Sequence, residues 1–103
     1  MAVVKVTDKD FNEKVISGGK TVVVDVSTDW CPSCKMLAPV FDKASDELTD
    51  VVFAAVDASE CPGVATQYGV QYVPTLLLFR DGQLVKQQVG ALSPVELEQF
   101  IRG

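Results

Sequence analysis

The chain of 103 residues contains no histidine. This absence removes the commonest general base and the commonest metal ligand together, and it excludes Ser-His and Cys-His nucleophile arrangements. Cysteine is also scarce: there are three residues, an odd number and too few for a disulfide framework.

Long apolar segments and an excess of positive charge are missing as well. No apolar run approaches the roughly 20 residues that span a bilayer, so we predict no membrane association. The first residues do not form a basic region followed by an apolar stretch, which indicates no secretory signal and a reducing, cytoplasmic location. A net charge of −5 repels phosphate backbones, so nucleic acid is not an expected partner.

Short apolar stretches separated by turn residues predict one domain, residues 1–103, in which strands and helices alternate before a final hairpin and helix. Thr7 to Asp10 resembles a capping box before a first helix, which ends at Gly18-Gly19. A second helix contains Pro39, a short third starts at Pro62, and the last is capped by Ser93. The turn Asp81-Gly82 predicts a hairpin. The pattern is that of an α/β fold whose expected strands are 3–6, 21–26, 51–57, 75–80 and 84–89.

The run Trp30-Cys31-Pro32-Ser33-Cys34 follows a buried strand and opens a helix. At a helix N-terminus the unpaired N–H groups and the partial positive charge favour the thiolate of Cys31. Cys34 lies about one turn further on, where it can close a disulfide with Cys31. We therefore predict a dithiol–disulfide oxidoreductase in which Cys31 attacks a substrate disulfide and Cys34 resolves the mixed disulfide.

Two other uses of these cysteines were weighed. Zinc requires four ligands, and Cys61 is the only further thiol in a chain without histidine. A purely structural disulfide would be opened in a reducing compartment. We predict neither a metal nor a cofactor.

Several motifs in the same order make the whole chain resemble the thioredoxin family. They are Val24-Asp25, Trp30-Cys31, Cys34-Lys35, Ala38-Pro39, Val73-Pro74-Thr75, Asp81-Gly82 and Val89-Gly90-Ala91. The resemblance implies the thioredoxin fold, a central mixed five-stranded sheet flanked by four helices. It also implies a monomeric protein-disulfide reductase that carries electrons in cell redox homeostasis, with disulfide-containing client proteins and a thioredoxin reductase as partners.

The resemblance further implies site residues. The Val73–Pro74 bond is expected to be cis and to face the cysteines. Trp30, Val73, Pro74, Gly90 and Ala91 would form an apolar surface that docks clients, with Pro32 and Ser33 between the cysteines. The family usually has Gly-Pro at those two positions, which leaves the redox potential open. Bacterial members usually carry a lysine where this chain has Ala55, which leaves the proton relay open.

Asp25 is unusual because it lies in a strand expected to be buried. An ionised, unpaired carboxylate there would cost several kcal/mol, so it would tend to stay protonated. One interpretation makes it the proton acceptor or donor for Cys34; the other is a strand-end aspartate that reaches water or a backbone N–H.

The third thiol, Cys61, precedes Pro62 at another expected helix start. It is interpreted either as a small residue that fills a helix entry or as an exposed thiol open to oxidation and dimer formation. Lys35 could support the Cys31 thiolate, although a lysine there is more often solvated.

Three competing functions were considered. A glutaredoxin-like protein is rejected because Thr75-Leu76-Leu77-Leu78 follows Pro74 in place of a paired glycine. A more oxidising oxidase or isomerase, and a binding subunit that uses the fold without turnover, remain as alternatives.

Overall fold

The computed structural model describes residues 2–103 and contains one mixed five-stranded sheet in the order β1-β3-β2-β4-β5. The strands are β1 (Val3–Lys5), β2 (Thr21–Ser27), β3 (Val52–Asp57), β4 (Thr75–Arg80) and β5 (Gln83–Val89). Strands β1, β3 and β2 are parallel, and β4 and β5 are antiparallel to their neighbours. The predicted α/β fold with an antiparallel edge is confirmed, and strand ends differ from prediction by one residue at most.

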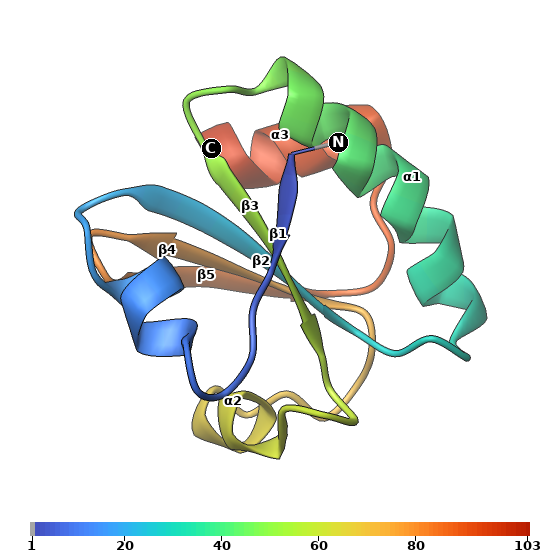
Figure 1. Cartoon of the computed structure of the whole chain (residues 1–103). Helices are drawn as coiled ribbons and strands as arrows, with labels where there is room; N and C mark the ends of the chain where they lie inside the picture. The colour runs from blue at the N-terminus through green and yellow to red at the C-terminus, as the bar shows by residue number, and fades with distance from the viewer. Residues whose placement is uncertain (1) are drawn as a thin grey trace.

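Helices cover both faces of this sheet. α1 (Pro32–Glu47) and α3 (Pro94–Arg102) pack on one face, and α2 (Pro62–Gln67) and the π-helix η1 (Asn12–Ile16) pack on the other (Figure 1). The central strand β2 is buried on both faces because its alternate residues enter two separate apolar clusters. This double burial explains its unbroken β-branched composition.

The first helix differs from the prediction. Thr7 does not cap a backbone N–H; instead its own N–H and hydroxyl both donate to the Asp10 carboxylate, at 2.6 and 3.1 Å. The helix that follows has π geometry, in which the Ser17 N–H donates to the Asn12 carbonyl. Phe11 and Val15 are nevertheless buried together as predicted, so the apolar spacing was correct. Of the two hydrogen bonds of a capping box, only the one from the Thr7 N–H to the Asp10 side chain is formed.

The hairpin and the last helix follow their sequence signals closely. Asp81 and Gly82 connect β4 to β5 with φ of 52° and 79°, the positive values that a two-residue hairpin turn requires. A Cβ on Gly82 would lie 2.7 Å from the Ile16 carbonyl oxygen, so glycine is also required sterically. Ser93 and Glu96 form both hydrogen bonds of a capping box, at 3.2 and 2.9 Å.

Strand register sets the surroundings of the site. Asp25 of β2 pairs with Ala55 of β3, and Ala55 pairs with Lys5 of β1. Paired residues point to the same face, so these three side chains form one row across the sheet on the face covered by α1 and α3.

Candidate active site

The two cysteines lie at the start of α1, as predicted. Cys31 is the N-cap residue, and its sulfur accepts a hydrogen bond from the Cys34 backbone N–H at 3.2 Å. The Cys31 thiol is 3.6 Å from the Val73 carbonyl oxygen, to which it donates. Pro32 occupies the first turn, where its missing N–H costs no helical bond. The predicted helix is continuous through Pro39.

The two thiols differ in exposure and in acidity. Cys31 is partly exposed, whereas Cys34 is only 4% exposed. Hydrogen bonding from the Cys34 thiol, and then from the backbone N–H groups of Cys34 and Ser33, lowers the pKa of Cys31. Burial, together with the hydrogen bond to Cys31, raises the pKa of Cys34 to about 11. At neutral pH the reactive thiolate is therefore favoured at Cys31.

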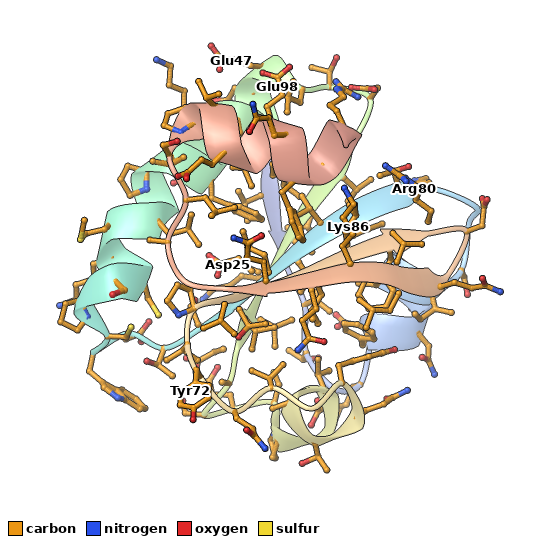
Figure 2. All side chains as sticks on the ribbon, turned by 180° about the vertical axis from the view of Figure 1, so that it is seen from behind. Asp25, Glu47, Tyr72, Arg80, Lys86 and Glu98 are labelled. Atoms are coloured by element: carbon orange, nitrogen blue, oxygen red, sulfur yellow. The ribbon has the colours of Figure 1, made fainter. Side chains whose placement is uncertain are left out.

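Asp25 lies in the interior, between the sheet and the layer formed by α1 and α3 (Figure 2). It is 5% exposed, and its Oδ1 atom has no hydrogen-bond partner among residues 2–103. Burial, and then the negative charge of Asp42, raises the pKa of Asp25 to about 7. Its charge adds a small contribution to the raised pKa of Cys34 and opposes the lowering of the Cys31 pKa, which places the three groups in one electrostatic unit. Oδ1 therefore accepts no backbone N–H from residues 2–103, which removes the backbone-bonded form of the strand-end interpretation for this atom.

The segment opposite the cysteines contains a cis peptide bond between Val73 and Pro74, as expected. The Gly90 N–H donates to the Pro74 carbonyl at 2.8 Å, which holds residues 90–91 beside this segment. Trp30 is 68% exposed, Ala91 is exposed, and Val73 and Gly90 are half-buried. Pro32 and Ser33 are exposed on the helix side of the same region.

Pro74 requires a correction. It was expected on the docking surface, but it is buried beneath it. The reason is its position immediately before β4, whose first residues are inserted between the two apolar layers. Pro74 therefore supports the segment from below while Val73 faces outward.

Sequence reasoning missed three residues near the site. Tyr72, 67% exposed, precedes Val73 and lies at the periphery of the molecule (Figure 2). Asp42 lies on α1, eight residues after Cys34, and acts on Asp25 through its charge. Thr28 has a buried hydroxyl without a partner among residues 2–103. Of these three residues, only Asp42 could have been found from the sequence, because it follows Cys34 on the same predicted helix.

Cys61 and Lys35 lie outside this cluster. Cys61 is 2% exposed, and its thiol points toward the Val6 carbonyl oxygen at 3.8 Å. The alternative of an exposed, oxidisable thiol is therefore wrong, because the residue fills the entry of α2 against Val6, which follows β1. Lys35 is exposed, and the groups that most lower the Cys31 pKa belong to Cys34 and Ser33.

Residues 2–103 bring together no group of three or more His, Cys, Asp or Glu side chains that could hold a metal ion. They also contain no helix with the length and apolar character needed to cross a membrane.

The thioredoxin family model matches residues 2–103. A thioredoxin of Mycobacterium tuberculosis is 45% identical over 91 residues, which is 87% of this chain and 78% of that protein. Thioredoxins of Allochromatium vinosum and Acidithiobacillus ferridurans are 41% and 39% identical over 101 residues, which is 97% of this chain and 94% of each relative. These similarities do not favour the oxidase, isomerase or binding-subunit alternatives. Sequence, fold and relatives agree: the chain belongs to the thioredoxin family and is a thiol-disulfide oxidoreductase, a protein-disulfide reductase that acts on disulfide substrates and receives electrons from a reductase.

Proposed function

We propose that Cys31 is the attacking thiolate and Cys34 the resolving thiol of this reductase. The observation that carries the proposal is the opposite perturbation of two neighbouring thiols: the pKa of Cys31 is lowered, and that of buried Cys34 is raised to about 11. An exposed thiolate reaches a client disulfide, while a sheltered neutral thiol does not compete for it.

The reaction then has two displacements. The Cys31 thiolate attacks one sulfur of the client disulfide, and the other client sulfur leaves as a thiolate. Cys34 loses its proton and attacks the Cys31 sulfur, which releases the second client thiolate and leaves a Cys31–Cys34 disulfide. The client gains the two electrons that the dithiol loses, and the two client thiolates take up protons.

Asp25 is the proposed acceptor of the Cys34 proton. A thiol with a pKa of about 11 is almost entirely protonated at neutral pH, so its attack needs a base. The Asp25 carboxyl has a pKa of about 7, close to the working pH, and its charge acts on the pKa of Cys34. A general base is most effective when its pKa lies near that pH.

The proposed docking surface consists of Trp30, Val73, Gly90 and Ala91 around Cys31. Its support is the contact between Cys31 and the Val73 carbonyl, together with the bond that holds Gly90 beside Pro74. We also propose that the protein works as a single-domain monomer in the cytoplasm and serves electron transport for cell redox homeostasis.

Trapping tests the assignment of the two cysteines. Cys34→Ser should accumulate a stable mixed disulfide with a disulfide-bearing client, because the first displacement proceeds and the second does not. Cys31→Ser should form none. Non-reducing gels with mass spectrometry of the adduct read the result. A better trap from Cys31→Ser would reverse the two roles.

A further inference from the structure

At the carboxyl end of β2, beside Cys34, two buried oxygens have no hydrogen-bond partner within residues 2–103. They are Oδ1 of Asp25 and Oγ1 of Thr28. Buried polar atoms are nearly always hydrogen-bonded to protein or to ordered water, and an unpaired one costs free energy. Their surroundings therefore indicate a place where solvent reaches the interior.

A cavity of about 200 Å³ lies at this end of the sheet. Its lining includes Ala55, the direct neighbour of Asp25 in the row across the sheet, and Lys5, the next residue in that row. Ser27 and Asp57, which pair with each other two residues further along β2 and β3, line it as well. The smallest side chain of the row thus separates buried Asp25 from an open space.

This cavity has the size and the chemistry to hold water. The minimum for one water molecule is about 10–15 Å³ with two to four polar partners. Besides Lys5, Ser27 and Asp57, the lining supplies the carboxylates of Asp29 and Glu60. Hydrogen bonds from Ser59, with a smaller contribution from the Lys5 charge, lower the pKa of Asp57, so the mouth stays ionised at neutral pH.

The other sides of Asp25 offer no comparable route. On β4 it pairs with Leu76, which is fully buried. On the side of α1, Asp25 meets the charge of Asp42, and its own charge acts on the thiols of Cys31 and of Cys34, its proposed proton donor. The side of β3 and β1, with Ala55, Lys5 and Asp57, is the one that leads to a polar cavity.

We propose that the cavity beside Ala55 is the route by which protons pass between Asp25 and solvent, and that the small size of Ala55 keeps this route open. This inference rests on the proposed role of Asp25 as the base for Cys34. In each turnover the Cys34 proton moves to an Asp25 carboxylate oxygen. It then passes to water in the cavity and from there to bulk solvent, which protonates the released client thiolate. Ala55 is a positioning residue here, since it touches neither substrate nor sulfur.

Filling the cavity tests the proposal. In Ala55→Leu the larger side chain should displace water next to Asp25 and raise the pKa of its carboxyl by about one pH unit. Resolution of a preformed mixed disulfide by Cys34 should then slow about fivefold at pH 7 and recover as the pH rises, since the ionised fraction of Asp25 at pH 7 falls from about one half to about one tenth. The pKa is read from the Asp25 carboxyl carbon signal in an NMR titration, and the rate from single-turnover kinetics across pH.

The matched control is Ala44→Leu. Ala44 is a half-buried alanine that lines a separate cavity of about 140 Å³ between α1 and α3. The Ala44→Leu substitution adds the same volume on the same face of the sheet but in a different cavity. The pH profile of this variant should therefore match that of the wild-type protein. A shift of equal size in both variants would indicate a general packing effect and overturn the proposal.

Asp25→Asn separates failure of this inference from failure of the proposed function. If Asp25→Asn slows resolution but Ala55→Leu moves neither the pKa nor the profile, the base is correct and the route is wrong. If Asp25→Asn leaves resolution unchanged, both are wrong. A high-resolution crystal structure of the wild-type protein gives a test without any variant: ordered water within hydrogen-bond distance of Asp25 Oδ1 on the Ala55 side supports the route, and a dry Oδ1 overturns it.

Discussion

Two helices of this protein begin with the same dipeptide, Cys-Pro, and the two cysteines have opposite properties. Cys31 and Cys61 are both N-cap residues followed by proline in the first turn. The sulfur of Cys31 caps its own helix by accepting the Cys34 N–H, whereas Cys61 forms no side-chain cap. The pKa of Cys31 is lowered, and burial raises the pKa of Cys61.

The difference arises from the residue that satisfies the helix N-terminus. At α2 the free N–H groups of Gly63 and Val64 donate to the two carboxylate oxygens of Asp8, each at 2.9 Å. Burial is the main cause of the raised pKa of Cys61, and the charge of Asp8 opposes the hydrogen bond that the Asp8 backbone offers to the sulfur. At α1 no carboxylate lies in the first turn, and the N–H groups are left for sulfur. A helix start thus makes a thiol acidic only where its donors are not taken by another group.

The largest expected effect is on activity. Cys31→Ser should abolish disulfide reduction, whereas Cys61→Ser should keep essentially the wild-type rate, because only Cys31 is exposed and acidified. Insulin reduction with dithiothreitol measures both, and alkylation by iodoacetamide at pH 6 should label Cys31 well before Cys61. Equal labelling of the two thiols would contradict the comparison.

A second prediction concerns the free energy of unfolding that is lost because the Asp25 carboxyl is buried beside the reactive cysteines. Asp25 has a pKa of about 7 in the folded protein and 3.8 as its ordinary value, so the folded state holds a proton that the unfolded state releases between these pH values. Its contribution to stability is fully present below about pH 4 and is lost as the pH rises through about 7. About three pKa units correspond to roughly 4 kcal/mol.

Asp25→Asn should therefore be more stable than the wild-type protein at pH 8, by up to roughly 4 kcal/mol less the cost of burying an unpaired amide. Near pH 4 the two proteins should differ far less. Urea unfolding at the two pH values gives the free energies. If the gain in the free energy of unfolding of Asp25→Asn were no larger at pH 8 than at pH 4, ionisation of the buried carboxyl would not destabilise the wild-type protein. No such penalty is expected at Cys61.

A third prediction removes the cap of α2. Asp8→Ala loses two hydrogen bonds to backbone N–H groups and should lower the free energy of unfolding by about 1–2 kcal/mol, as removal of an N-cap does. Local opening of α2 should also expose Cys61 to alkylation. The control is Glu13→Ala, which removes an exposed carboxylate from η1 and should change stability by less than about 0.5 kcal/mol. Urea midpoints and the labelling rate of Cys61 measure the two effects; equal midpoints for both variants would show that Asp8 is not a cap.

The same comparison shows what could be predicted from sequence. The strands, the Asp81-Gly82 hairpin, the Ser93 cap and the position of Cys31 at a helix start depend on local patterns of two to four residues, and they were predicted correctly. The interpretation of Cys61 stayed open because its environment is not local. The Asp8 carboxylate that caps α2 is 55 residues from Gly63, and the Val6 carbonyl that receives the thiol is 55 residues from Cys61.

The site shows the same limit. The burial of Asp25 was expected from the apolar residues around it, but the charge of Asp42 and the cavity beside Ala55 depend on how α1 and β1 pack against β3. The exposure of Tyr72 and the burial of Pro74 depend on where the chain enters the sheet. The π geometry of η1 had no signal, since its apolar spacing also suits an α-helix.

The smallest expected effect concerns the residues between the reactive cysteines. The backbone N–H of Ser33 and that of Cys34 both lower the pKa of Cys31, whereas Pro32 has no N–H to offer. In the double variant Pro32→Gly, Ser33→Pro, the proline moves by one position, so the Ser33 donor and its hydroxyl are lost and a donor at position 32 is gained. Position 32 is the first of the helix and lies nearest the capping residue, where the N–H is less well directed at the N-cap side chain than those of the second and third positions.

The thiolate should consequently be less stable in the double variant. A neutral hydrogen bond contributes about 1 kcal/mol, and about 1.4 kcal/mol corresponds to 30 mV for this two-electron couple, so the shift should be roughly 20–30 mV toward a more reducing potential. The wild-type potential is then expected tens of millivolts above the roughly −270 mV of thioredoxin and well below the roughly −120 mV of a dedicated oxidant. Equilibration of both proteins with glutathione measures the difference. The exchange at α2, Pro62→Gly, is the control, because Cys61 accepts no cap bond there and the potential should not move. If the double variant were no more reducing than the wild-type protein, the position of the proline would not affect the hydrogen bonds that stabilise the Cys31 thiolate.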